Sequence, residues 1–346
     1  MALFDSAKPL PIPEIGNVIF NTQSAAVPFT RLLRKEPGNP NQMLQEWPME
    51  LYPDRGYVGT ADGADVTSYS HFTRHPAKSF AMLLRTEGVK VTKLAQLTVD
   101  AGVGRKQEMA RQLLVDGKVL AQMMERSCLS ILDMREEDRT DPSNVIPYRS
   151  RGAGSWLNSS AQGVNPVHAS FRPAEAAYRT DPLDELTPDA VESMLEAMSI
   201  QRKQKVDLKV ICGTKFKRAM SLWGEKVPVE SGEQVVQAFN IDKKEQKFLS
   251  AINRFEFDSG SFYTLPPSFY LACNEATGEP TDYSTRSAYF VDTSMWSLRY
   301  LQEPRAFENP DLGGGPRAYH DVVFVLACKN PMGQGAWLTN LSEASS

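Results

Sequence analysis

Cysteine is scarce in this chain, and its few copies form no metal-binding or disulfide pattern. The four cysteines lie far apart, at positions 128, 212, 273 and 328. No two of them are separated by only two residues, so the ligand spacing of a zinc ribbon is missing. A disulfide framework, typical of short secreted chains, is not indicated either. We therefore expect reduced cysteines that fill space in the core.

Long apolar runs are missing as well. No segment reaches the roughly 18 consecutive apolar residues that a membrane-spanning helix requires. The first ten residues, MALFDSAKPL, contain no apolar stretch as long as that of a signal peptide. We expect neither a membrane span nor a secretory leader.

The chain has no excess of positive charge. Its formal net charge is −4 at pH 7. A protein whose main task is to grip nucleic acid needs clustered Lys and Arg that displace counterions, so this class is disfavoured. The length of 346 residues and the hydrophobic content of 41% predict two or three folded domains with buried cores.

Motifs of catalysis are also absent. The turn Gly213-Thr214-Lys215 lacks the first glycine and the lysine of a phosphate-binding loop, and Gly313-Gly314-Gly315 lacks the dinucleotide-binding spacing. No Gly-x-Ser-x-Gly nucleophile elbow occurs. His71 and His75 are four residues apart, but no third ligand is near them in the sequence, which favours surface histidines of a hairpin. We expect no catalytic, cofactor-binding or metal-binding residue.

Proline is concentrated at the start of the chain. Eight of the 23 prolines fall within the first 53 residues, and each fixes φ and removes an N–H donor, which predicts an extended arm. The arm also carries apolar side chains that need cover, namely Val18, Ile19, Phe20, Val27, Phe29, Leu32 and Leu33. They could pack on their own subunit or strap a neighbouring one, and the sequence leaves both open.

Residues 44–84 predict a large β-hairpin. Its outgoing strand shows alternating apolar residues, Trp47, Met49 and Leu51. Residues 57–65 are rich in Gly and Asp and predict a turn, and residues 80–84 predict the return strand. The hairpin has little apolar mass of its own, so we expect it to need support from another surface.

A long helix is predicted from residue 105 to residue 134. Its apolar residues recur at intervals of three and four, as Met109, Leu113, Leu120, Met124, Cys128 and Ile131. Gly117 lies on the same face, where glycine costs about 1 kcal/mol relative to alanine, so it serves either close packing or a bend. The following residues, 135–184, are mostly polar, and the charged run at their start predicts a solvated surface.

The rest of the chain mixes helices and strands without a βαβ repeat, which predicts the α+β class. A helix begins with Thr187 as N-cap and Pro188 at its first position. It is followed by a strand at 205–212, a short helix with Phe216, Met220 and Trp223 on one face, and a hairpin at 251–271. Three apolar strand-like runs complete the pattern, at Ala288–Val291, Trp296–Leu301 and Tyr319–Cys328, with a Gly-rich loop at 312–316.

Six motifs resemble, in order along the chain, those of tailed-bacteriophage major capsid proteins with the Hong Kong 97-type fold. They are Asn21-Thr22-Gln23-Ser24 with Val27-Pro28-Phe29, then Glu46-Trp47, Gly63-Ala64-Asp65, the helix 105–134, the segment from Leu208 to Lys217, and Val291-Asp292 with Trp296-Ser297-Leu298. Glu46-Trp47 is similar to the motif that opens the extended loop in one branch of this family. The Thr-Pro of the first motif is interrupted here, and Asp62 stands where the family usually has Glu.

The resemblance implies a division of the chain into four parts. Residues 1–43 would be the N-terminal arm and residues 44–88 the extended β-hairpin loop. Residues 89–185 and 292–346 would form the peripheral domain, which contains the long spine helix. Residues 186–291 would form the axial domain.

The resemblance also implies a function. Copies of the chain would self-assemble in the host cytoplasm into pentamers and hexamers, which form the icosahedral head shell of a virion. The shell would enclose double-stranded DNA without binding its sequence, which suits the slightly negative charge. Scaffolding, portal and decoration proteins are further candidate partners, and no membrane or cofactor is implied. The candidate contacts between subunits are Phe29, Trp47, Arg55, Tyr57 and Arg74.

Two alternatives stay open at this point. One is an encapsulin-like nanocompartment shell of the same fold, which encloses cargo protein, and the other is an unrelated α+β enzyme. Some relatives also cross-link their subunits through an isopeptide bond between Asn and a lysine of the extended loop. Residues 44–77 contain no lysine, and the first is Lys78, so we expect a shell without covalent cross-links.

Overall fold

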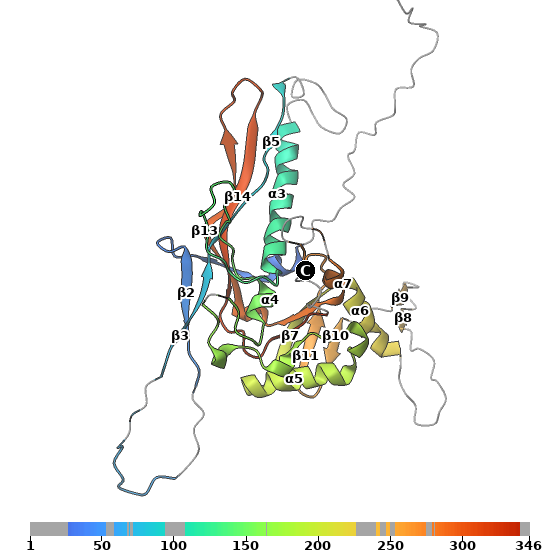
Figure 1. Ribbon diagram of the computed structural model, residues 1–346. Helices are drawn as coiled ribbons and strands as arrows, with labels where there is room; N and C mark the ends of the chain where they lie inside the picture. Colours follow the sequence, from blue (N-terminus) through green and yellow to red (C-terminus); the bar gives the residue numbers. More distant parts are fainter. Residues whose placement is uncertain are drawn as a thin grey trace, which may run out of the picture. The chain divides into compact units, whose positions relative to one another are not determined.

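The computed structural model describes residues 27–52, 59–67, 69, 72–93, 108–163, 165–225, 240–242, 247–249, 253–274, 279 and 281–339. These residues belong to two compact units. The smaller unit contains residues 85–93, 108–121 and 304–321, and the larger unit contains the others. Helix α3 (Glu108–Cys128) and strands β13 (Trp296–Asn309) and β14 (Arg317–Cys328) run from one unit into the other. Helices and strands are mixed along the chain, which confirms the predicted α+β class (Figure 1).

A six-stranded sheet forms the centre of the larger unit. Its strands lie in the order β10 (Arg254–Glu256), β11 (Gly260–Thr264), β7 (Val206–Cys212), β12 (Ala288–Val291), β15 (Gly335–Trp337) and β6 (Tyr178–Arg179). β10 and β11 are antiparallel and form the predicted hairpin, whereas β11 runs parallel to β7. β12 is antiparallel to both of its neighbours, and β15 and β6 are parallel. Helices α5 (Pro188–Arg202) and α6 (Thr214–Ser221) lie beside this sheet (Figure 1).

Local sequence signals account for α5. The Thr187 side chain accepts a hydrogen bond from the N–H of Ala190, and Pro188 occupies the first turn, as predicted. The helix ends at Lys203, whose left-handed φ of 57° stops it. Its predicted apolar stripe is buried, and consists of Val191, Met194, Leu195 and Met198.

The core of the larger unit fills the space between this stripe and the sheet. β7 alternates as predicted, with Val206, Leu208 and Val210 buried and Asp207 exposed. Aromatic rings complete the packing edge to face, with centroids 5.5 Å apart for Phe262 and Phe290 and 6.4 Å apart for Phe216 and Phe290. Such pairs add to the stabilisation that comes from buried area.

A second sheet contains β1 (Arg34–Pro37), β13, β14 and β4 (Met82–Arg85) in that order, with β5 (Val89–Lys90) also paired to β14. β1 runs parallel to the start of β13, and β5 runs antiparallel to the start of β14. The strand predicted at 296–301 is confirmed and continues to Asn309, and the strand predicted at 319–328 begins two residues earlier, at Arg317.

The predicted hairpin is formed by β2 (Leu44–Met49) and β3 (His75–Phe80), which are antiparallel. The return strand predicted at 80–84 was wrong, because β3 ends at Phe80 and Met82–Arg85 is β4 of the second sheet. Pro48 and Pro76 lie opposite each other in the hairpin and weaken the sequence signal for a strand. A two-stranded sheet tolerates them, because each strand has an open edge where a proline nitrogen needs no partner.

The long helix is shorter than predicted. Residues 105–107 lie outside the described part, and α3 ends at Cys128, not at residue 134. The backbone beyond it pairs with a later segment, since the carbonyl oxygens of Ser130 and Leu132 accept hydrogen bonds from Gly154 and Gly152. Gly152 is required there, because a Cβ atom would collide with the Ser130 carbonyl.

The remaining elements are short. They are α1 (Pro28–Leu32), α4 (Ala153–Trp156), α7 (Asp282–Arg286), the antiparallel pair β8 (Asn240–Asp242) and β9 (Lys247–Leu249), and 3-10 helices at Ala169–Phe171, Glu175–Ala177, Leu183–Glu185, Leu222–Glu225 and Thr293–Met295. In the stretch predicted to be solvated, Glu136, Asp138 and Arg139 are exposed, as expected for the charged run. Residues 150–157 are buried instead, because Arg151 forms an ion pair with Asp133 at 2.7 Å and lies over the Trp156 ring.

Candidate functional site

The surface most suited to a partner lies on the loop that joins β2 to β3. The described part of this loop has four large apolar side chains in solvent, with exposed fractions of 97% for Tyr52, 69% for Val66, 82% for Tyr69 and 58% for Phe72. Figure 1 shows the loop extending from the ends of the two strands. Large apolar side chains left in solvent on one loop make this loop a candidate surface for cover by another molecule.

Trp47 anchors the base of this loop to its own chain. Its side chain is only 5% exposed, and its indole Nε1 donates a hydrogen bond to the carbonyl oxygen of Cys328 at 2.9 Å. The Arg299 guanidinium lies 4.8 Å from the centre of the indole, and the Trp156 ring is 5.5 Å away. The hairpin therefore has a fixed base although its loop has little support of its own.

Two ion pairs flank the hairpin on its surface. Arg74 lies 2.9 Å from Glu50, and Lys78 lies 2.7 Å from Glu46. Arg74 is 73% exposed, and pairs of this kind contribute at most about 1 kcal/mol to stability. Their main effect is to hold these side chains in one orientation.

A buried carboxylate fixes the chain where the predicted arm reaches the larger unit. Glu125 of α3 is fully buried, and its two oxygens accept hydrogen bonds from the N–H groups of Phe29 and Thr30 at 2.8 and 2.7 Å. Burial raises the pKa of Glu125, although the hydrogen bonds from Thr30 and Phe29 act in the opposite direction. Phe29 is fully buried and packs edge to face on Trp296, with centroids 5.9 Å apart.

The five candidate contact residues are thus placed differently. Phe29 and Trp47 are buried within their own chain, so the own-subunit packing that the sequence left open holds for Phe29. Arg74 is exposed at the base of the loop, whereas Arg55 and Tyr57 lie outside the described residues. That any of these five residues contacts a neighbouring subunit stays a prediction.

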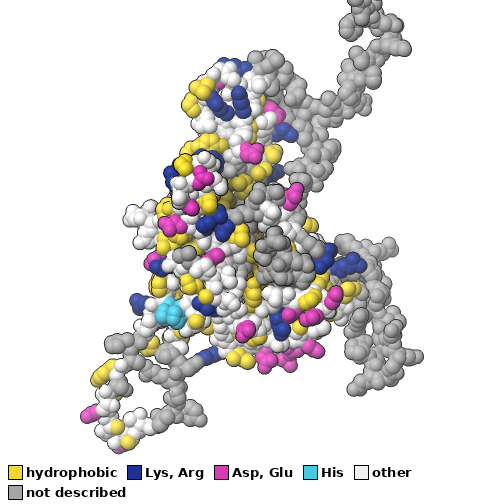
Figure 2. Space-filling view, in the orientation of Figure 1, with side chains coloured by type: hydrophobic (Ala, Val, Ile, Leu, Met, Phe, Trp, Pro, Cys, Tyr) yellow, Lys and Arg dark blue, Asp and Glu magenta, His cyan; other side chains and the backbone are white. Residues whose placement is uncertain are grey.

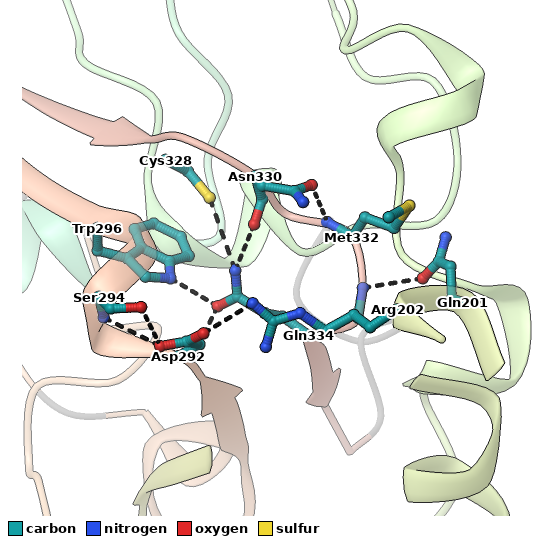
Figure 3. A network of polar contacts seen from close by, with 10 residues as sticks. Gln201, Arg202, Asp292, Ser294, Trp296, Cys328, Asn330, Met332 and Gln334 are labelled. Atoms are coloured by element: carbon teal, nitrogen blue, oxygen red, sulfur yellow. Dashed lines mark hydrogen bonds and ion pairs between the residues drawn. The ribbon is translucent and has the colours of Figure 1, made fainter. Parts of the chain in front are cut away.

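A polar network holds the chain between β12 and β13 (Figure 3). Gln334 is fully buried, and its Oε1 accepts hydrogen bonds from Trp296 Nε1 at 2.6 Å and from the N–H of Asp292 at 3.0 Å. Gln334 Nε2 donates to the carbonyl oxygen of Asn330, and Arg202 of α5 lies 2.7 Å from the Asp292 carboxylate.

The charge of Asp292 is stabilised by this network. Burial alone would raise the pKa of Asp292, but hydrogen bonds from Ser294 and Arg202 outweigh it and lower the pKa. Asp292 and Trp296 belong to the last motif of the sequence resemblance, so this motif helps to fix the connection between β12 and β13.

The described residues offer little chemistry for catalysis. Burial raises the pKa of the Cys212 thiol to about 12 and also raises the pKa values of Cys128, Cys273 and Cys328, and a protonated thiol is a poor nucleophile. All four cysteines are free, and three are buried as predicted. In the part of the chain that the structure describes, no three His, Cys, Asp or Glu side chains are grouped as a metal site would require. No helix there is long and apolar enough to cross a membrane.

The structure places His75 against His168, a residue that the sequence analysis did not connect with it. The rings of His75 and His168 are stacked, with centroids 3.6 Å apart, and both line a cavity of about 420 Å³ at the base of the hairpin. No local signal links them, because they lie in segments far apart along the chain. Glu125 was missed as well, because it is turned by about 100° from Met124 and lies beside the apolar stripe, so periodicity gave no signal for its burial.

Comparison with known proteins gives two results. The family model of the SU10 major capsid protein matches residues 4–318 of this chain. No curated protein sequence matches.

Solved structures share the fold. The capsid of a native GTA particle, computed with C5 symmetry, aligns with a TM-score of 0.55 at 10% identity, over 93% of this chain and 92% of that one. A chain of Mycobacterium phage Che8 aligns with a TM-score of 0.53 at 12% identity, over 97% and 98% of the two chains. The capsid of Cyanophage Pam1 gives 0.51 at 13% identity, also over 97% and 98%. These likenesses confirm the Hong Kong 97-type fold that the sequence resemblance implied.

Proposed function

Because this chain belongs to the SU10 major capsid protein family, we propose that its copies form pentamers and hexamers that tile an icosahedral shell around double-stranded DNA. Family and fold indicate a structural role, not an enzymatic one. Assembly would take place in the host cytoplasm, and the finished shell would stay in the virion. Glu46-Trp47 supports placing the chain in the branch whose extended loop opens with this pair.

The observation that carries the proposal is the apolar surface of the loop between β2 and β3. A single chain leaves Tyr52, Val66, Tyr69 and Phe72 in solvent, while it buries Trp47 at the base of the same hairpin. A long projection with a fixed base and an uncovered apolar surface is suited to lie over an adjacent subunit. Contacts that join different surfaces of identical copies close into rings when the angles fit, as a shell requires.

The first experiment asks whether shells form. The protein is expressed alone and together with the neighbouring virion genes, and is examined by negative-stain electron microscopy and by size-exclusion chromatography with light scattering. We expect closed shells, and nuclease-protected double-stranded DNA in particles from infected cells. Monomers or dimers under every condition would contradict the proposal, and shells filled with cargo protein would point to a nanocompartment.

The second experiment removes the tip of the loop, residues 56–70. We expect a folded subunit, because the anchoring contacts of Trp47 lie outside the deletion, and a loss of shells. Far-UV circular dichroism and thermal melting provide the control for folding. Normal shells from this variant would show that the loop is not a lateral contact.

A further inference from the structure

The cavity at the base of the hairpin is lined by cationic and imidazole side chains from two segments of the larger unit. His75 and Lys78 come from β3, and His168 and Arg172 come from residues 165–172. The cavity measures about 420 Å³, within the range of small ligand sites. Figure 2 shows the histidine side chains of this face gathered in one patch.

The wall at residues 165–172 is held in place by hydrogen bonds. Arg172 Nε donates to the carbonyl oxygen of Val167 at 2.7 Å, and Gln201 Nε2 donates to that of Arg172 at 2.6 Å. Arg151, whose side chain is 1% exposed, donates through Nη2 to the carbonyl oxygen of Asn165 at 3.0 Å. These bonds fix the backbone of the wall and the guanidinium of Arg172 before any partner arrives, which lowers the cost of binding.

The lining suits a carboxylate on an apolar stem. None of the described lining residues is acidic, and the carboxylate paired with Lys78 belongs to Glu46. His168 Nδ1 accepts a hydrogen bond from the N–H of Ser170 at 3.4 Å, which leaves Nε2 as the ring nitrogen that can donate. Pro76, Pro166 and Val167 supply apolar walls.

Helix α5 carries a surface of complementary charge. Asp189, Glu192 and Glu196 recur at intervals of three and four, so they share one side of the helix, and Ile200 continues this stripe with 67% of its surface exposed. The stripe lies away from the buried residues Val191, Met194, Leu195 and Met198. No residue of α5 lines the cavity among the described residues of the same chain.

We infer that the cavity receives a carboxylate from the acidic stripe of α5 of a second copy of this chain. The contact joins two different surfaces, so it is heterologous and can propagate around a ring. The inference rests on the proposed shell function and names one of its lateral contacts. Opposite charges would guide the encounter and set the register, and added salt would weaken both effects.

The test is a charge exchange across the proposed contact. His168→Glu places a negative charge in the cavity, and His168→Gln is the matched control of similar size without charge. We expect His168→Glu to raise the protein concentration at which shells form by about tenfold or more, and His168→Gln to change it by less than about twofold. Combining His168→Glu with Glu192→Lys and Glu196→Lys should restore most of the loss. Light scattering and electron microscopy measure assembly, and thermal melting checks that each subunit is folded.

The outcomes separate this inference from the proposed function. If the wild type forms no shells, the proposed function fails. If the wild type forms shells and His168→Glu assembles at the same concentration, the contact is refuted and the function stands. A loss that the α5 substitutions do not restore refutes α5 as the partner. Normal assembly with reduced DNA retention would identify nucleic-acid phosphate as the occupant, which also overturns the inference.

Discussion

At the scale of single residues, buried polar groups hold together segments that are far apart in the sequence. Glu125 is the clearest case, because a fully buried carboxylate is costly unless hydrogen bonds compensate it. Here the N–H groups of Phe29 and Thr30 supply them, and both belong to the short helix α1.

Replacing Glu125 by alanine should destabilise the subunit. The substitution leaves two buried N–H groups without their acceptor and creates a cavity, and we expect a loss of about 3 kcal/mol in unfolding free energy. Denaturant unfolding of the unassembled subunit measures it. A loss below about 0.5 kcal/mol would mean that the two amides find other acceptors.

Glu125→Gln tests the pH dependence. The folded-state pKa of Glu125 is raised above its ordinary value of 4.5, so the folded protein binds this proton more tightly than the unfolded chain does. The contribution of the group to stability is therefore greatest at acidic pH and falls as the pH rises from 4.5 through the folded-state pKa. The wild type should lose stability relative to Glu125→Gln over that range, and a constant difference would contradict the raised pKa.

The Arg202–Asp292 ion pair should have the opposite pH dependence: its contribution to the unfolding free energy should be lost at acidic pH. Because the folded-state pKa of Asp292 is lowered, its contribution is present above 3.8 and is lost as the pH falls through the folded-state pKa. Arg202→Met should cost about 2 kcal/mol at neutral pH, since it leaves the partly buried Asp292 carboxylate without its cation. Arg139→Met removes an exposed ion pair and is the control, and we expect it to cost less than Arg202→Met. Equal costs would show that burial does not strengthen the Arg202 pair.

Sequence patterns could not identify these polar residues, because their partners are distant. Glu125 bonds to residues 95 and 96 positions away, and Trp47 bonds to a carbonyl 281 positions away. Side-chain periodicity reports which face of an element is apolar, not which polar group it will meet. The stacking of His75 on His168 could not be predicted for the same reason, because the two residues are far apart in the sequence.

At the scale of elements, the sequence predicted the longer helices and most of the longer strands but not the short elements, and the errors have local causes. The N-cap of α5, the alternation of β7 and the three C-terminal strands followed from short-range rules that the structure confirms. The end of α3 did not, because hydrogen bonds to Gly152 and Gly154 from a later segment replace the next helical turn. The start of β3 was hidden by Pro76.

Of the two explanations for Gly117 in α3, close packing or a bend, the structure argues against close packing. A Cβ atom at this position would lie 3.7 Å from Nε2 of His320, an ordinary contact, so close packing does not require glycine there. Gly117→Ala should therefore raise the unfolding free energy by about 1 kcal/mol, the difference in helix propensity. A stability lower than that of the wild type would show that the alanine methyl group is not accommodated.

The same variant tests whether the helix bends in the particle. If flexibility at Gly117 serves a change of shell size, Gly117→Ala should bias particles toward one state and alter the kinetics of expansion. Time-resolved light scattering of matched wild-type and variant particles measures the kinetics. Identical expansion kinetics together with a more stable subunit would contradict the hypothesis that the helix bends at Gly117 during expansion.

At the scale of the whole molecule, we expect shells held without covalent cross-links. Residues 44–77 contain no lysine. The first lysine after them, Lys78, forms an ion pair with Glu46 at 2.7 Å at the base of the hairpin. An arginine cannot replace it, because the guanidinium stays protonated. Mature particles boiled in detergent should release one band at the mass of a single chain. A ladder of larger species that survives a reducing agent would refute this and would make Lys78→Arg the next variant to test.

The pairing of β1 with β13 has a consequence for protein synthesis. Arg34, the first residue of β1, pairs with Ser297 of β13, and Trp47 needs the carbonyl of Cys328. At a ribosomal rate of roughly 5–20 residues per second, the first segment waits on the order of tens of seconds for its partner. A nascent or truncated chain therefore lacks the strand that pairs with β1 and the hydrogen bond that anchors the hairpin, although the bonds between Glu125 and α1 can form earlier. We expect chains that stop before Cys328 to be unable to form both contacts, and therefore to be excluded from assembly.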